Sequence, residues 1–148
     1  MHKTSPMDVI SERLGERMDE FLIPPPVFVA MKGELIDIDL EVGTLTTRFP
    51  VLEAYQNPFR SMQGGMVAAA VDNTLGPLSM LVAPPNVTRR LDMKYSLPIM
   101  MDLEFIIVTG QLVGSEGRNL TLKAEVRGPE NQLLARARAT HWILEEGR

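Results

Sequence analysis

Residues 64–81 read GGMVAAAVDNTLGPLSML, and this stretch decides the fold. The side chains that follow its two glycines are apolar on almost every side of a helix, a pattern typical of a buried helix rather than of a surface helix. We therefore expect a central helix that other elements cover on all sides. A proline inside a helix removes one backbone hydrogen bond, so Pro77 is expected to bend or end this helix.

Asp72 is the only charged residue in this stretch. A carboxylate among apolar side chains is usually paired or functional, which makes Asp72 a candidate for chemistry. At the helix start, the backbone N–H groups of Gly64 and Gly65 have no helical partner, and no side chain keeps a ligand oxygen away. Gly64 and Asp72 are separated by about 12 Å along a helix axis. One carbonyl cannot touch both, so a shared site would need two chains related by a two-fold axis.

Alternating polar and apolar residues predict strands on either side of this helix. A hairpin with one wet face is expected over residues 34–49, and its apolar alternation runs through Ile36, Ile38, Leu40, Val42, Leu45, Thr47 and Phe49. Four more strands are expected at residues 88–97, 103–113, 119–127 and 133–144, with glycine and proline turns between them. Near the N-terminus, Ser5-Pro6-Met7-Asp8 is a good helix start, and this helix should continue to the prolines at 24–26.

These elements predict an α+β fold with an antiparallel β-sheet wrapped around a central buried α-helix. Residues 1–26 would form an N-terminal covering helix and a proline-rich connection, and residues 27–148 a single domain. A length of 148 residues suits one domain with a real core.

Composition excludes several classes of function. The net charge of −4 gives no support to nucleic-acid binding. The absence of cysteine removes disulfides, thiolate catalysis and thiolate metal sites. No signal-length apolar stretch follows the N-terminus, and no long apolar run lacks a breaker, so we expect a cytoplasmic protein without a membrane segment.

Five elements, in order and with their spacing, carry a resemblance to a known family. They are Asn57, the triplet Gln63-Gly64-Gly65, Asp72, Thr88 and Pro98. This set resembles the hotdog-fold acyl-CoA thioesterases of the phenylacetate-pathway (PaaI-like) type, in which the triplet is usually His-Gly-Gly. The similarity covers roughly residues 42–144.

The resemblance implies a hotdog fold and hydrolysis of an acyl-CoA thioester to a carboxylic acid and free coenzyme A. Asp72 would be the general base or nucleophile, Asn57 would orient the water or substrate, and the Gly64 amide would polarise the carbonyl. The site would lie across the interface of a homodimer, which could pair again into a homotetramer. No cofactor is expected apart from the coenzyme A of the substrate, and no metal. The expected substrate-binding residues are Gln63, Gly65, Thr88, Arg89, Arg90 and Arg118. The three arginines and Lys94 would form a positive rim for phosphates if the strands bring them together.

Other functions stay open or are disfavoured by the residues present. Gln63 cannot titrate near neutrality, so a non-catalytic acyl-CoA or lipid-binding hotdog protein is the alternative. Hydratases of this fold rely on a histidine near an acid, and the sequence places no histidine near the loop or the central helix. His141 is expected to be a strand or interface residue. A serine hydrolase is disfavoured because the chain has no Gly-x-Ser-x-Gly elbow.

Overall fold

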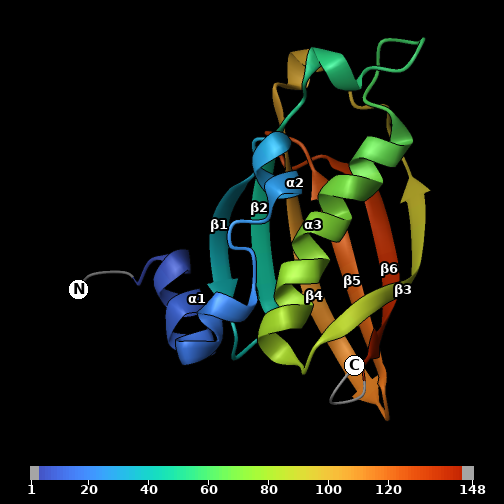
Figure 1. Ribbon diagram of the computed structural model, residues 1–148. Coiled ribbons are helices and arrows are strands. Elements are labelled where there is room, and N and C mark those ends of the chain that lie inside the picture. Colours follow the sequence, from blue (N-terminus) through green and yellow to red (C-terminus); the bar gives the residue numbers. More distant parts are fainter. Residues whose placement is uncertain (1–3, 145–148) are drawn as a thin grey trace.

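The computed structural model describes residues 4–144, and within them six strands form one antiparallel sheet in the order β1-β2-β4-β5-β6-β3. One long helix, α3, lies along one face of this sheet, and β3 forms the edge beside it (Figure 1). The strands are β1 (Glu34–Asp39), β2 (Thr44–Pro50), β3 (Asn86–Tyr95), β4 (Phe105–Glu116), β5 (Asn119–Arg127) and β6 (Leu133–Ile143). The helices are α1 (Pro6–Leu14), α2 (Pro26–Ala30) and α3 (Gly64–Val82), with short 3₁₀ turns η1 (Gly15–Glu20), η2 (Glu53–Tyr55) and η3 (Met101–Leu103). The predicted fold class is confirmed.

The contact between α3 and the sheet is apolar and close. Val71, Leu75 and Leu78 of α3 are fully buried against the inner side chains of the strands, and burying each contributes about 1.5–3 kcal/mol. Gly110 of β4 permits this approach, because a Cβ there would lie 2.8 Å from Leu75 Cδ2. The helix is therefore held close to the middle of the sheet.

The opposite face of α3 is not covered within one chain. Ala68, Ala69 and Gly76 are half-buried, and Asp72 is exposed. The expectation of burial on all sides is wrong for the single chain, because the sheet covers one side of the helix only. Among residues 4–144, α3 is also the one helix long and apolar enough to cross a membrane, a test that the core helices of soluble proteins pass as well.

Pro77 does not end α3, which continues to Val82. The ring removes one helical N–H, but the turn around it is reinforced by Ser79, whose hydroxyl donates to the Gly76 carbonyl at 2.7 Å. Five residues of helix follow the proline and bring Leu78 and Leu81 into the core. The sequence expectation that Pro77 could end the helix is therefore not met.

The N-terminal segment departs from its prediction in a similar way. Ser5 caps α1 as expected, but the helix ends at Leu14, where Gly15 has a φ of +54° and a 3₁₀ turn begins. The third proline, Pro26, starts α2 rather than only stopping a helix, since proline suits the first helical turn. α1 lies beside β1 (Figure 1) and also contacts α3.

The first strand is shorter and less regular than its alternation suggests. A bulge between Leu35 and Asp37 leaves Ile36 44% exposed, although the pattern places Ile36 on the apolar face. A bulge shifts the faces of the residues on either side of it, so Leu35 is partly buried and Ile38 is buried. In β2, Leu45, Thr47 and Phe49 are buried as predicted. The later strands match their predicted positions within about three residues.

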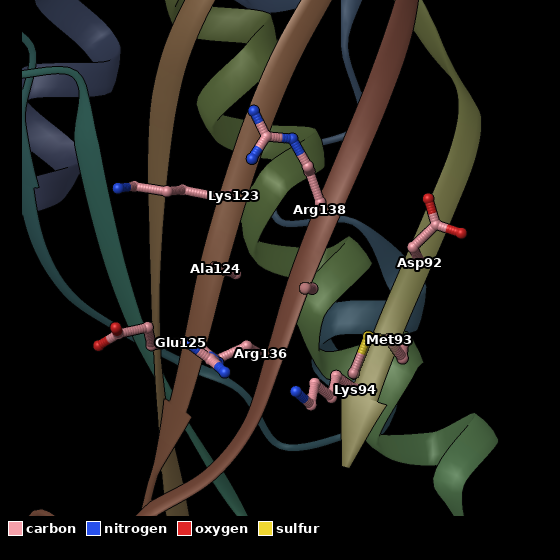
Figure 2. A pocket seen from close by; sticks show the side chains of 9 residues that line it. Asp92, Met93, Lys94, Lys123, Ala124, Glu125, Arg136 and Arg138 are labelled. Carbon is pink, nitrogen blue, oxygen red and sulfur yellow. The ribbon is translucent and has the colours of Figure 1, made fainter. Parts of the chain in front are cut away.

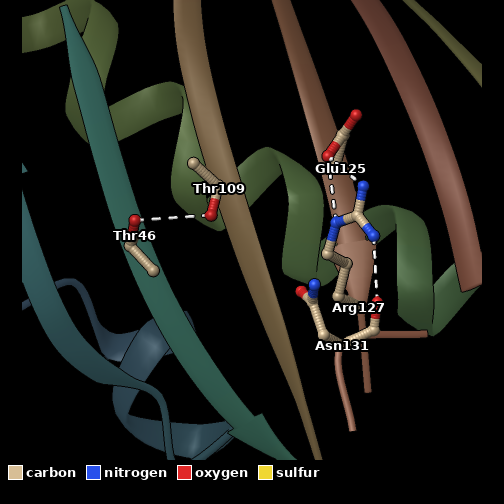
Figure 3. Close-up of polar contacts among 5 residues, drawn as sticks. All are labelled: Thr46, Thr109, Glu125, Arg127 and Asn131. Carbon is tan, nitrogen blue, oxygen red and sulfur yellow. Dashed lines mark hydrogen bonds and ion pairs between the residues drawn. The ribbon is translucent and has the colours of Figure 1, made fainter. Parts of the chain in front are cut away.

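The outer face of the sheet is polar. Thr46 and Thr109 meet across β2 and β4 with their hydroxyls 3.4 Å apart, and Arg127 pairs with Glu125 at 2.9 Å (Figure 3). Arg127 also donates to the Asn131 carbonyl at 2.9 Å. α3 lies on the other face, and the buried apolar side chains of the core lie between that face and the helix.

Candidate functional site

Asp72 projects from the uncovered face of α3 and is anchored by one residue of β3. The Thr88 hydroxyl donates to Asp72 Oδ1 at 2.9 Å. This bond leaves Oδ2 available, and Asp72 has no cationic partner among the described residues. The carboxylate expected to be buried is thus exposed in the single chain, held in place by a neutral donor.

An apolar cavity of about 310 Å³ lies beside Asp72. Its walls come from the N-terminal segment, from β1 and β2, and from α3. The lining includes Ile10, Ile23, Phe28, Leu35 and Met80, together with Asp72 itself. Asp72 is therefore the one charged side chain that the described part of the chain contributes to the wall of this cavity.

The start of α3 presents a different kind of chemistry. The helical hydrogen bonds begin at Met66, whose N–H donates to the Gln63 carbonyl at 2.9 Å, so the amides of Gly64 and Gly65 precede the helical ladder. Gly65 and the Gln63 side chain are exposed, and that side chain makes no capping bond. Gly64 lines a second cavity of about 340 Å³, together with Asn57, Ser61 and Tyr95.

The side chain of Asn57 forms hydrogen bonds within its own loop. Its Oδ1 accepts from the N–H groups of Phe59 at 2.9 Å and Ser61 at 3.1 Å, and its Nδ2 donates to the Ser61 hydroxyl at 2.9 Å. These bonds shape the turn that leads into α3, and they leave one N–H of the amide for a ligand. Asn57 and Gly64 are brought to one cavity, and Asp72 lines a different one.

One strand fixes both of these regions. β3 runs back along α3, so Thr88 near its start reaches Asp72 and Tyr95 at its end reaches the first turn of the helix. The Tyr95 hydroxyl donates to the Gly64 carbonyl at 2.6 Å, and burial raises the pKa of Tyr95 above its ordinary value. Sequence reasoning missed Tyr95, because nothing in a strand-terminal tyrosine indicates which helix it touches.

The predicted positive rim separates into two groups. Arg89 and Arg118 both stack on Trp142, each with its guanidinium carbon 4.7 Å from the ring centroid. Arg90 instead pairs with Asp92 at 2.8 Å, where both side chains are largely exposed. The structure therefore brings Arg89 and Arg118 together and leaves Arg90 apart from them.

His141 lies near the central helix, contrary to the sequence expectation. It lines a third cavity of about 410 Å³ with Gly76 and Ser79 of α3 and with Thr88 of β3. Burial lowers the pKa of His141, and the negative charge of Asp72 partly opposes that shift. The premise that excluded hydratase chemistry is thus wrong, because the pairing of β6 with β3 brings His141 to a cavity that α3 also lines.

A shallow hollow on the outer face of the sheet is not part of this arrangement. Figure 2 shows it over β3, β5 and β6, with α3 on the far side of the strands. It has a volume of about 380 Å³ and carries interspersed charges of both signs, from Asp92, Lys94, Lys123, Glu125, Arg136 and Arg138. Lys94 of the predicted positive rim lines it, and the other residues predicted for the site do not. Separately, no group of three or more His, Asp or Glu residues within 4–144 is arranged to hold a metal.

Comparison with solved structures identifies the architecture. The phenylacetic acid degradation-related protein of Ralstonia eutropha JMP134 matches with a TM-score of 0.77 and 22% identity, over 91% of this chain and 98% of that one. PaaI from the phenylacetic acid degradation operon of Escherichia coli matches with a TM-score of 0.78 and 13% identity, over 91% and 96%. This chain has the hotdog fold.

A further hotdog structure carries a ligand. The hypothetical thioesterase protein of Streptococcus pneumoniae TIGR4, solved with coenzyme A, matches with a TM-score of 0.69 and 14% identity, over 76% of this chain and 85% of that one. No protein-family profile and no curated protein matches the sequence. The resemblance stated from the motifs is thus supported at the level of the hotdog fold.

Proposed function

We propose that this hotdog chain is an acyl-CoA thioesterase whose active site is shared between two chains of a homodimer. One observation carries the proposal. Asp72 stands in the wall of an apolar cavity, while the free helix-start amide of Gly64 lines a separate cavity of the same chain. Each position supplies half of what thioester hydrolysis needs, and a two-fold axis would bring the halves of two chains together.

The Gly64 half would stabilise the oxyanion. A thioester oxygen placed over the start of α3 would accept from the Gly64 N–H and feel the positive end of the helix dipole. Such a donor typically contributes about 3 kcal/mol to the transition state. Tyr95 supports this geometry, because its bond to the Gly64 carbonyl fixes the peptide that follows the donating N–H.

The Asp72 half would supply the base or the nucleophile. As a base, Asp72 takes a proton from water while the water oxygen attacks the carbonyl carbon; the C–S bond then breaks and the thiolate takes up the proton. As a nucleophile, Asp72 attacks the carbonyl carbon, the C–S bond breaks to release the coenzyme A thiolate, and water opens the resulting mixed anhydride in a second step. A single turnover in ¹⁸O-labelled water separates the routes, since label in Asp72 requires the anhydride.

The acyl group would occupy the apolar cavity beside Asp72. The cavity is lined almost entirely by aliphatic and aromatic side chains, which favours an apolar acyl or aryl group over a charged one. Gly76 lies in its wall, and a Cβ added there would meet nothing within 4 Å. Substitution of Gly76 by leucine should therefore narrow the cavity and shift the preference toward shorter acyl groups. The mass of the particle must be measured as well, because Gly76 also lies on the face through which the dimer would pair.

The two arginines that stack on Trp142 would contact coenzyme A. Arg89 and Arg118, held by Trp142, would bind phosphates of the nucleotide, with Gln63, Gly65, Thr88 and Arg90 as further contact residues. The reaction needs no metal and no cofactor beyond this coenzyme A. The cytoplasmic location expected from the sequence stays part of the proposal.

Two features support the dimer. α3 has an uncovered face rich in small apolar residues, and β3 is an edge strand whose hydrogen-bonding groups face outward. Pairing through these surfaces would cover both. A dimer of dimers is a further expectation, tested by measuring the mass of the particle in solution.

The test is thiol release from a panel of short, medium and aromatic acyl-CoAs, with an enoyl-CoA included. We expect release from at least one saturated or aromatic acyl-CoA, and its loss on the substitution Asp72→Asn. Tight binding of acyl-CoA without thiol release would favour the non-catalytic binding protein. Loss of the enoyl absorbance without thiol release would favour a hydratase.

A further inference from the structure

His141 is held in one tautomer by the residues around it. Its Nδ1 lies 2.8 Å from Asn86 Oδ1. The Asn86 amide nitrogen donates to two carbonyls, those of Ser79 at 3.2 Å and Pro84 at 2.9 Å, so the amide oxygen is the atom that faces the ring. An amide oxygen only accepts, so Nδ1 carries the proton and the neutral ring presents a bare lone pair at Nε2.

That lone pair is buried and unused. His141 is 1% exposed, and its Nε2 has no hydrogen-bond partner among the described residues. Buried polar atoms are nearly always paired, so an orphaned acceptor needs an explanation. His141 lines the cavity of about 410 Å³ whose wall also includes Thr88, its cross-strand partner in the register of β3 and β6. Gly76 and Met80 belong to the walls of both this cavity and the acyl cavity beside Asp72.

The groups around His141 identify what the lone pair would bind. Asp72 on α3 is the charged group whose field acts on the ring, and Thr88 on β3 donates its hydroxyl to Asp72. From the other elements, Leu120 of β5 and Phe21 of the N-terminal segment are uncharged. A buried water needs two to four polar partners. Thr88 belongs to the wall of the cavity that His141 lines, and its hydroxyl reaches Asp72 in the wall of the acyl cavity. Together with Nε2, these are the polar groups that a water between the two cavities would bind.

We propose that His141 completes the Asp72 half of the site by accepting, at Nε2, a hydrogen bond from the water that Asp72 activates. One O–H of the water points to the carboxylate and transfers its proton there as the oxygen attacks the thioester carbon. The other O–H is held by Nε2 and keeps its proton. His141 thus orients the nucleophile and is not itself the base. This inference rests on the proposed thioesterase function.

The kinetic test compares His141→Leu with His141→Gln. Leucine has no acceptor, so kcat should fall by about 10- to 100-fold, with the KM for acyl-CoA within about twofold of wild type. The glutamine oxygen can accept from water, so His141→Gln should recover part of kcat. Thermal melting and the mass of the particle show whether each variant is folded. Equal kcat values for wild type and both folded variants would overturn the role.

A pH profile separates this role from a structural one. Protonation would turn Nε2 from an acceptor into a donor, so wild-type kcat should fall as the pH drops through the pKa of His141. Burial places that pKa below the ordinary value of about 6.5. In His141→Gln the acid limb should move to lower pH. An unchanged limb would contradict the proposal.

Nitrogen NMR of the imidazole supplies a readout that needs no substrate. The chain has two histidines, so His141→Gln assigns the signals unambiguously. At neutral pH His141 should show the Nδ1–H tautomer, and Asp72→Asn should lower its pKa further, because a charge that favours the imidazolium is removed. A predominant Nε2–H tautomer would overturn the inference. A wild type inactive on every thioester would instead reject the proposed function, and the role of His141 with it.

Discussion

The two candidate regions of α3, its start at Gly64 and its middle at Asp72, differ in the groups that they present. At its start the chemistry is in the backbone: the Gly64 amide precedes the helical ladder, and the Tyr95 hydroxyl holds the same residue through its carbonyl. Eight residues later the reactive groups are side chains. Asp72 accepts a hydrogen bond from the Thr88 hydroxyl, and His141 lines a cavity together with Thr88. The first region can stabilise negative charge and the second can create a nucleophile. In the proposed function neither region would perform hydrolysis alone, because about 12 Å of helix separates them within one chain.

The largest effect should come from the side-chain region. Asp72→Asn preserves the size of the group and an oxygen that accepts from Thr88, but it removes the charge. We expect kcat to fall by about 10³-fold while the dimer and its melting temperature change little. Asp102→Asn, an exposed substitution in η3, serves as the matched control and should leave kcat unchanged. Retention of most activity in Asp72→Asn would remove Asp72 from the mechanism.

The backbone region can be tested without changing a functional side chain. Gly64→Pro deletes the donating N–H at the first helical position, where proline is tolerated. The preceding residue, Gln63, already has the extended backbone that proline requires, with φ −55° and ψ 135°. We expect kcat to fall by about 10²-fold.

Gly64→Ala is the matched control for this substitution. It adds a Cβ 3.2 Å from the Tyr95 ring, a contact that a small ring movement relieves, but it keeps the amide. It should retain most of the activity. Equal losses in the alanine and proline variants would show that space, rather than the N–H, matters at this position.

A smaller effect is expected at Thr88. Thr88→Val keeps the shape of the side chain and removes the hydroxyl that donates to Asp72. Loss of one such bond should lower kcat by about tenfold. Thr88→Ser retains the hydroxyl and should stay close to wild type. If valine and serine behave alike, the bond seen between Thr88 and Asp72 has no part in positioning the carboxylate.

The smallest effect should be on binding of the nucleotide. Arg89→Ala removes one of the two guanidinium groups on Trp142. The KM for an acyl-CoA should rise by about threefold to tenfold, because a charged contact to phosphate is lost. The KM for the matching acyl-pantetheine, which lacks the nucleotide, should not change. A parallel rise with both substrates would assign Arg89 to the fold instead.

The sequence predicted the elements whose signals are local. The apolar stretch after Gly64 predicted α3, the alternation around Leu45 predicted β2, and Ser5 predicted the start of α1. Local signals failed where one residue changes the backbone path. Gly15 ends α1 early and the bulge in β1 turns Ile36 outward, and neither is visible in a pattern of hydrophobicity.

The sequence singles out candidate site residues but not their arrangement in space. Asp72, Gly64 and Asn57 are singled out by type and spacing, and the fold places them in two separate cavities. His141 could not be found in the same way, because strand pairing brings it to Thr88 from 53 positions along the chain. A link of that kind depends on the register of β3 and β6, which no single stretch of sequence contains.

The central claim is that one working site needs the two halves from different chains, and mixed dimers test it most directly. Asp72→Asn and Gly64→Pro, each expected to keep about 1% of wild-type kcat or less, are mixed in equal amounts, unfolded and refolded together. In a heterodimer one of the two sites receives an intact Asp72 and an intact Gly64 amide, so activity should return to about a quarter of that of refolded wild type. If the heterodimer forms but the mixture stays as inactive as the two variants, the site does not span two chains.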